Sequence, residues 1–212
     1  VRGGLGVSTM NVGTVYFHDN QFANHAAVNV FWNFGNSIVY SGDTRDRFSF
    51  YETDTYTKLA EELYPETDST VRILKSSRPD IIIIMLESFS AKLIKTLGGE
   101  ESVTPSFNSL SSEGVLFSHI YATDSRTDKG LASVLSGFPV TESIPILSHP
   151  EKNAGLPFIS SDLAAAGYHT SFSYGGDIDF ANMRSYLVNG KFSSINSEDN
   201  YTTSDKKGKW GL

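Results

Sequence analysis

The chain has 212 residues, enough for one domain with its own core and at most a short appendage. Seventeen Lys and Arg stand against 24 Asp and Glu, and this net charge of −7 disfavours a nucleic-acid binder, which needs a basic surface. The apolar content of 39%, with 14 Phe and 10 Tyr, excludes a disordered chain, and no apolar run approaches the ~20 residues of a membrane span.

Residues 1–75 lack the alternation of strands and helices that a sheet domain needs, so we expect them to form an arm that wraps around the rest of the chain. Asp19 is placed to cap a helix that contains Phe34. Asp54 is placed to cap a second helix that ends at Tyr64.

The strongest apolar run of the chain is residues 81–86 (IIIIML), which follow Pro79 and precede Glu87. Six apolar residues without alternation, rich in β-branched isoleucine, are typical of a strand buried on both faces. The run therefore predicts the central strand of a parallel or mixed sheet that is covered by helices.

Helices that end at glycine follow this strand. Thr104 and Pro105 are placed as N-cap and first residue of a helix that ends at Gly114. The other predicted elements are a strand over 115–121, a helix that includes Leu131 and ends at Gly137, a helix over 157–166, a strand over 168–174 and a loop over 202–209. This order predicts an α/β fold in residues 76–212, with a mostly parallel sheet sandwiched between helices.

Chemistry in this chain must come from oxygen and imidazole groups, because cysteine is absent. Glu87 directly follows the predicted central strand, at the edge where open α/β sheets bind ligands, so its carboxylate is a candidate ligand for a hard divalent cation. The alternative is an acid that is merely solvated.

Thr127 is the second candidate, because it lies between a predicted strand and a helix. Backbone N–H groups at the N-terminus of a helix stabilise an oxyanion or a phosphate. The alternative is that Thr127 or Ser125 only caps the helix, with Asp124 as a turn residue.

Three stretches are specific in combination, although each is common alone: residues 78–89 (RPDIIIIMLESF), 103–110 (VTPSFNSL) and 125–130 (SRTDKG). Together they resemble the lipoteichoic acid synthase branch of the sulfatase and alkaline phosphatase superfamily. The similarity covers roughly residues 78–190. In addition, Tyr16 to Phe34 resembles the arm that links membrane helices to the catalytic domain in that branch.

This resemblance implies the N-terminal part of an extracytoplasmic catalytic domain, with an alkaline phosphatase and sulfatase fold that is incomplete at its C-terminus. It also implies a membrane tether through helices outside this chain. Glu87 would be a metal ligand, and Thr127 would be the nucleophile, bound to the same metal. The resemblance points to Mn²⁺, with Mg²⁺ or Zn²⁺ as alternatives. A threonine hydroxyl is too weakly acidic to attack unless a cation lowers its pKa.

Residues 175–184 (GGDIDFANMR) depart from that family's G-N-T-Q-x-F-W-N-R stretch. Ala181 takes the position of the Trp and Met183 that of the Arg, so Arg184 is a displaced candidate for substrate binding, beside Lys129. Family members take an Asp-His pair of ligands from sequence that would follow Leu212. We therefore expect residues 1–212 alone to bind metal weakly and to turn over little phosphate ester.

The leading hypothesis is a metal-dependent phosphotransferase or phosphohydrolase that acts on phosphodiesters or phosphomonoesters of phosphorylated lipids or glycans at the cell surface. One alternative is a sulfuric ester hydrolase, but its formylglycine route requires Cys or Ser where this chain has Thr127. The other is a non-catalytic binding or structural module that has lost part of the metal site. A salt bridge from Arg126 or Lys129 between Glu87 and Thr127 would favour the module.

Overall fold

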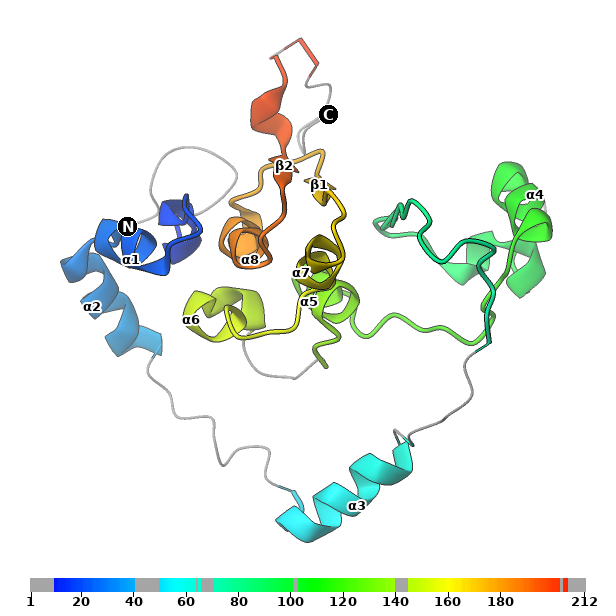
Figure 1. Ribbon diagram of the computed structural model, residues 1–212, viewed down its shortest axis with the longest axis horizontal. Coiled ribbons are helices and arrows are strands. Elements are labelled where there is room, and N and C mark those ends of the chain that lie inside the picture. Colours follow the sequence, from blue (N-terminus) through cyan, green and yellow to red (C-terminus); the bar gives the residue numbers. More distant parts are fainter. Residues whose placement is uncertain are drawn as a thin grey trace. The chain divides into compact units, whose positions relative to one another are not determined.

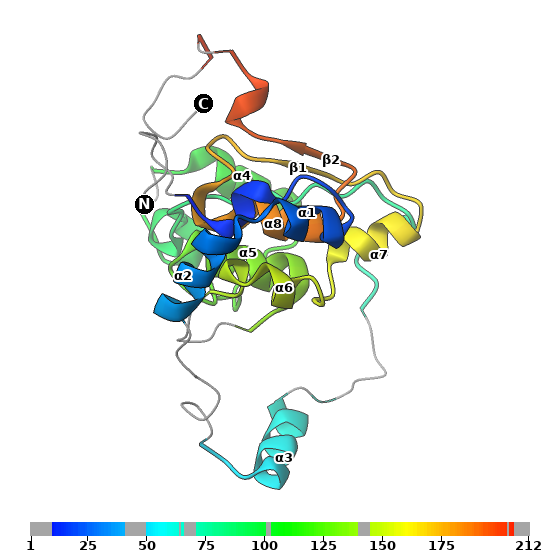
Figure 2. The same cartoon turned by 90° about the vertical axis from the view of Figure 1, so that its left-hand side faces the viewer.

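Figures 1 and 2 show the computed structural model of the protein, which describes residues 10–40, 50–63, 65, 71–100, 103–139, 145–202 and 204–205. The chain forms two compact units, and each is described by itself. Unit 1 comprises residues 1–41 and 121–212, and unit 2 comprises residues 42–120.

Unit 1 contains most of the regular structure that the described residues form. Its α-helices are α1 (Gln21–Ala27), α2 (Val30–Tyr40), α5 (Thr127–Ser136), α6 (Pro150–Asn153), α7 (Ile159–Ala165) and α8 (Met183–Asn189). Its short 3₁₀ turns are η1 (Val12–Val15), η4 (Ile146–Ser148), η5 (Phe180–Asn182) and η6 (Glu198–Asn200), and its strands are β1 (Ser171–Ser173) and β2 (Ser194–Asn196).

Strands β1 and β2 form a two-stranded parallel sheet, with α8 between them in the chain. In this register Ser171 pairs with Ser194, and Phe172 pairs with Ile195. Parallel strands need a crossover connection, which α8 provides here. A parallel sheet in a helix-rich unit confirms the predicted α/β class.

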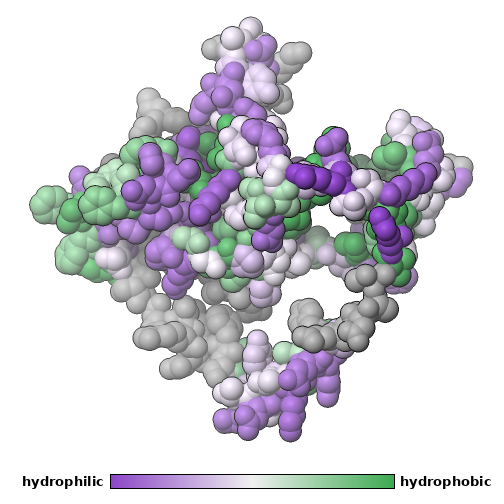
Figure 3. Space-filling model, viewed as in Figure 1, coloured by the Kyte–Doolittle hydropathy of each residue, from purple (hydrophilic) through white to green (hydrophobic). Residues whose placement is uncertain are grey.

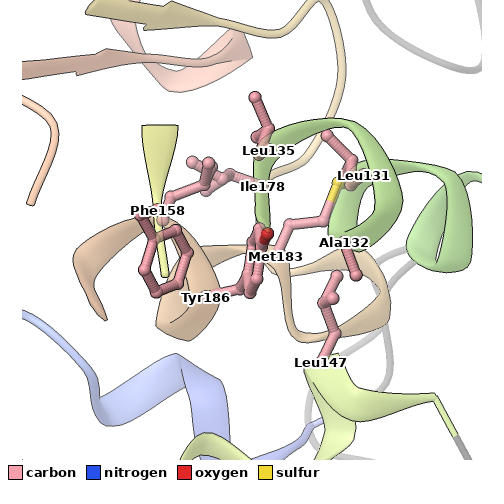
Figure 4. Close-up of a cluster of buried hydrophobic side chains, with 9 residues drawn as sticks. Leu131, Ala132, Leu135, Leu147, Phe158, Ile178, Met183 and Tyr186 are labelled. Atoms are coloured by element: carbon pink, nitrogen blue, oxygen red, sulfur yellow. The ribbon is translucent and has the colours of Figure 1, made fainter. Parts of the chain in front are cut away.

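The core of unit 1 joins α5 to α8 (Figure 4). Leu131 and Leu135 are four residues apart on α5, a spacing that places both on one face of the helix. They contribute to a buried cluster of nine side chains: Leu131, Ala132, Leu135, Leu147, Phe158, Ile178, Met183, Tyr186 and Leu187. This cluster anchors α5, the helix that begins at Thr127.

The three helices predicted from glycine stops are present. Helix α4 (Pro105–Glu113), in unit 2, has Thr104 at its N-cap and Gly114 at its C-cap. Helix α5 ends at Gly137, whose φ of 60° is the left-handed conformation that glycine adopts without strain. Helix α7 and strand β1 confirm the predicted helix over 157–166 and strand over 168–174, each over a shorter range.

The predicted central strand is wrong. Residues 81–86 have no strand structure, and their side chains are between 42% and 85% exposed. The predicted strand over 115–121 is also wrong, because that segment contains a turn at Ser118 and His119. A strand forms only by pairing, and the described residues of unit 2 contain helices α3 (Thr53–Leu63) and α4 and the turns η2 (Ala91–Leu93) and η3 (Lys95–Leu97), but no strand.

The predicted single helix that contains Phe34 is divided into α1 and α2. Asn20, and not Asp19, caps α1 by accepting a hydrogen bond from the Phe22 N–H. Asn29 accepts from the Trp32 N–H and starts α2 as a second helix. Helix α3 matches the second predicted helix as far as Leu63, and Tyr64 lies outside the described residues. The domain boundary at residue 75 stays a prediction.

Exposed apolar side chains gather over α1 and α2 (Figure 3). Phe22, Phe31 and Phe34 are 80%, 88% and 67% exposed. Among the described helices, none combines the length and the apolar character that a membrane crossing requires.

Candidate active site

Thr127 is the first helical residue of α5, so its hydroxyl lies at the N-terminus of a ten-residue helix. The N-cap is Arg126, which makes no side-chain cap. The first helical hydrogen bond runs from the Gly130 N–H to the Arg126 carbonyl oxygen over 2.9 Å. The interpretation that Thr127 or Ser125 serves as the N-cap is therefore wrong. Thr127 is half-buried, at a helix end that favours negative charge.

The charged residues around Thr127 form two ion pairs. Arg126 Nη2 lies 3.1 Å from Asp128 Oδ2, and Asp128 is 5% exposed. Lys129 Nζ lies 2.9 Å from Asp124 Oδ2. Asp124 also accepts a hydrogen bond from the Arg126 N–H at 3.0 Å. Each cation of this turn is thus balanced by an aspartate of the same turn.

Lys129 also sets the ionisation of Asp124. Its hydrogen bond is the largest cause that holds the pKa of Asp124 below the usual value of 3.8. Burial acts in the opposite direction, and the Lys129 charge and the backbone N–H groups of Arg126 and Ser125 lower the pKa further. Asp124 is therefore an anion at neutral pH. It orients the Lys129 ammonium beside the start of α5, which sequence reasoning did not predict.

Glu87 lies in unit 2, on an exposed segment that precedes η2. The hydroxyl of Ser88 donates to Glu87 Oε1 at 3.4 Å, and Ser88 itself has a φ of +54°. A single cation bound by both Glu87 and Thr127 stays a prediction, because the two residues belong to different units.

The donors that the sequence predicts for a metal are a carboxylate and a hydroxyl, oxygen ligands that suit Mn²⁺ or Mg²⁺. Over the described ranges, no group of three or more His, Asp or Glu residues is placed to hold a metal ion. Glu87 and Thr127 therefore fit a hard cation by their chemistry, as part of a site that needs further ligands.

Arg184 lies at the start of α8, and its guanidinium is held by carboxylates. Asp179 Oδ1 accepts from Nε at 2.5 Å, and Asp179 Oδ2 accepts from Nη2 at 3.3 Å. Asp199 Oδ2 is 3.8 Å from Nη2. These carboxylates, Asp179 first, raise the pKa of Arg184, so it is always charged. Sequence reasoning named Arg184 but missed Asp179, five residues before it.

The loop before Arg184 has an unusual backbone. Ala181 and Asn182 both have left-handed conformations, with φ of 53° and 61°. Side chains other than glycine rarely adopt this region, and such residues concentrate at functional sites. This loop follows β1, at the carboxyl end of the strand where α/β sheets bind ligands.

Residues 79–211, more than half of the chain, match the family described as Sulfatase. The chain belongs to the sulfatase family. It is also similar to the crystal structure of a protein in the alkaline phosphatase superfamily from Vibrio parahaemolyticus, with 35% identity and a TM-score of 0.54. That match covers 59% of this chain and 30% of the Vibrio protein, so this chain spans less than a third of that protein's length.

The sulfatase match encloses all the candidate residues, namely Glu87, Thr127, Lys129 and Arg184. Within the sulfatase family, the assignment to the lipoteichoic acid synthase branch stays a prediction.

Proposed function

We propose that this sulfatase-family chain is part of a metal-dependent phosphotransferase or phosphohydrolase in which Thr127 is the nucleophile. The substrates would be phosphodiesters or phosphomonoesters of phosphorylated lipids or glycans, handled on the extracytoplasmic face of a membrane. The observation that carries the proposal is the position of Thr127, the first residue of a helix that has no side-chain cap.

The reaction would proceed in two displacements. Thr127 Oγ1 forms a bond to phosphorus, the bond from phosphorus to the leaving oxygen breaks, and the threonine proton passes to that oxygen through solvent. Water or an alcohol then attacks the phosphothreonine, and the threonine oxygen leaves and regains a proton. Water as acceptor makes the enzyme a phosphohydrolase, and an alcohol makes it a phosphotransferase.

Groups around Thr127 can stabilise the negative charge of the phosphoryl group during these displacements. N–H groups of the first turn of α5 and the dipole of the helix favour the negative oxygens of a phosphoryl group. Lys129 and Arg184 are the candidate cations for substrate, each oriented by an aspartate. A divalent cation, held by Glu87 and Thr127 with ligands from elsewhere, would lower the pKa of the threonine hydroxyl when bound.

Two other functions compete with this proposal. Sulfate-ester hydrolysis is the alternative that the family name suggests. Its formylglycine route requires Cys or Ser at the position of the nucleophile, and the proposed nucleophile Thr127 cannot become formylglycine. A non-catalytic module is the other alternative, because Arg126 and Lys129 form ion pairs in this turn. Both pairs join residues of the same turn, so neither pair involves Glu87.

The test compares ester classes in the full-length protein. We expect turnover of p-nitrophenyl phosphate or bis(p-nitrophenyl) phosphate, little turnover of p-nitrophenyl sulfate, and loss of activity with a chelator. Thr127→Ala should lose about 10³-fold or more in kcat, because it removes the nucleophile. Thr123→Ala is the control, since this exposed hydroxyl four residues away donates to Ser133 Oγ. Faster turnover of the sulfate, or full activity in Thr127→Ala, would contradict the proposal.

A further inference from the structure

The N-terminal segment of the chain is hydrogen-bonded to the loop that follows β1. Asn11 Nδ2 donates to the Asp179 carbonyl oxygen at 2.8 Å, across 168 residues of sequence. The Gly13 N–H donates to Asn182 Oδ1 at 3.4 Å. Both contacts lie within unit 1. Two positions at the start of the chain thus meet two positions of residues 177–182, which we call the β1 loop.

The core also holds the same loop and the residue that follows it. Ile178 and Met183 are 3% and 1% exposed and belong to the cluster that contains Leu131 and Leu135 of α5 (Figure 4). The β1 loop therefore contacts the N-terminal segment and also contributes Ile178 to the core that includes α5. A displacement of the N-terminal segment or of the core would therefore displace the loop, because packed interiors transmit displacements.

Left-handed residues make the loop depend on these contacts. Asn182 and Ala181 keep a conformation that persists only when the surrounding structure enforces it. Gly13 fits closely here, because a Cβ on it would lie 3.2 Å from both Asn182 Oδ1 and Ser185 Oγ. A side chain at position 13 would therefore displace the side chains of Asn182 and Ser185.

The loop in turn orients Arg184. Asp179, whose carbonyl oxygen receives the Asn11 bond, binds the Nε and Nη2 edge of the guanidinium with its carboxylate. Among the described residues, Nη1 of Arg184 has no hydrogen-bond partner, and the side chain is 32% exposed. One edge of the guanidinium is thus fixed and the remaining nitrogen is available to a ligand.

We propose that Asn11 is a positioning residue for substrate: it fixes Asp179 and the β1 loop, and thereby aims Arg184 Nη1 at an anionic oxygen of the substrate. The substrate part of this inference rests on the proposed phosphoryl-transfer function. The part that concerns the loop rests on the hydrogen bonds alone. Sulfate and phosphate esters share the anionic oxygen, so the assay must include both.

Asn11→Asp tests the Asn11 bond in the full-length protein. This change keeps the side-chain oxygen that accepts from the Gly13 N–H at 2.9 Å, but it removes the donor to Asp179. Asn20→Asp is the matched control. Asn20 caps α1 through the same kind of oxygen, and among the described residues its side chain bonds only to the Phe22 N–H.

Two measurements give the result. In Asn11→Asp, hydrogen exchange should become about tenfold faster at the amides of Phe180 and Arg184, which donate to Asp177 and Ile178, while α5 keeps its protection. KM for p-nitrophenyl phosphate should rise about fivefold with kcat nearly unchanged, because binding and not chemistry is affected. Asn20→Asp should change neither.

The outcomes separate the two parts of the inference. Unchanged exchange in Asn11→Asp would overturn the positioning role, whatever the kinetics show. Faster exchange with an unchanged KM would overturn the link to substrate and leave a structural contact. If the wild-type protein turns over only the sulfate ester, the phosphoryl-transfer proposal fails. The hydrogen-exchange rates and KM for the sulfate ester then still decide the role of Asn11.

Discussion

Ser136 Oγ lies 2.6 Å from the phenol oxygen of Tyr186, inside the cluster that joins α5 to α8. Burial raises the pKa of Tyr186 to about 12, and the hydrogen bond with Ser136 acts in the opposite direction. This neutral pair connects the helix that begins at Thr127 to the helix that carries Arg184. Thr127 and Lys129 on α5 and Arg184 on α8, the candidate site residues of unit 1, therefore share one rigid support.

Alkaline pH should destabilise this support. The pKa of Tyr186 is raised above its unfolded value of 10.0, so its contribution is complete below pH 10 and is lost as pH rises towards about 12. The difference of about 2 between the folded and unfolded pKa values corresponds to roughly 3 kcal/mol in the free energy of unfolding. Chemical denaturation at several pH values should show a decline of this order between pH 10 and 12. In Tyr186→Phe the decline should be smaller.

Tyr186→Phe should also cost about 1 kcal/mol at neutral pH, because the buried Ser136 hydroxyl loses its partner. Adding Ser136→Ala should recover part of that loss, because it removes the unpaired group. A double variant that is less stable than the sum of the two single variants would contradict this interpretation of the pair.

Low pH should destabilise the turn before α5 by protonating Asp124. Its pKa in the folded protein is lowered, so its stabilising effect is present above the usual value of 3.8 and is lost as pH falls through the lowered value. Asp124→Asn should reduce the loss of stability below about pH 4. Lys129→Met should reduce it similarly, since Lys129 is the main cause of the shift. If both variants lose as much stability below about pH 4 as the wild type does, the ion pair of Asp124 with Lys129 is not formed in solution.

Two glycines give opposite predictions for the same substitution. A Cβ at Gly190 would lie 3.0 Å from Phe158 Cδ1 and 3.2 Å from Phe192 Cε2. We expect Gly190→Ala to lower the free energy of unfolding by about 1–3 kcal/mol, because both rings must shift. A Cβ at Gly130 would meet no atom of the described residues within 4 Å apart from its chain neighbours and the backbone of its own helix, so Gly130→Ala in α5 should raise stability by about 0.5–1 kcal/mol. Thermal unfolding of both variants checks the two predictions. A lower stability of Gly130→Ala would contradict the described helix.

Local signals predicted the helices of this protein better than its strands. Thr104 with Pro105, and Gly137 after α5, specify helix ends through contacts within a few residues. Residues 81–86 have the composition of a buried strand, but strand formation depends on partners far away in the sequence. The order of elements was sufficient for the α/β class.

The candidate site shows the same division. The sequence predicts that Thr127 lies at the start of a helix, because the Gly137 stop and the apolar spacing of α5 fix its ends. It does not predict which aspartate pairs with Lys129 or Arg184, because those pairs depend on how the turns fold back. The contact of Asn11 with Asp179 spans 168 residues, beyond any local pattern.

Trapping of a covalent intermediate tests the central role of Thr127 most directly. The full-length protein is mixed with a phosphodiester and a divalent cation, quenched in acid within the first turnover, digested and analysed by mass spectrometry. We predict one phosphoryl group, still esterified to the alcohol that did not leave, on the peptide that contains Thr127. It should be absent in Thr127→Ala and with chelator, and present in Thr123→Ala. A phosphoryl group on another residue, or turnover without any phosphorylated peptide in Thr123→Ala and the wild type alike, would contradict threonine nucleophilic catalysis.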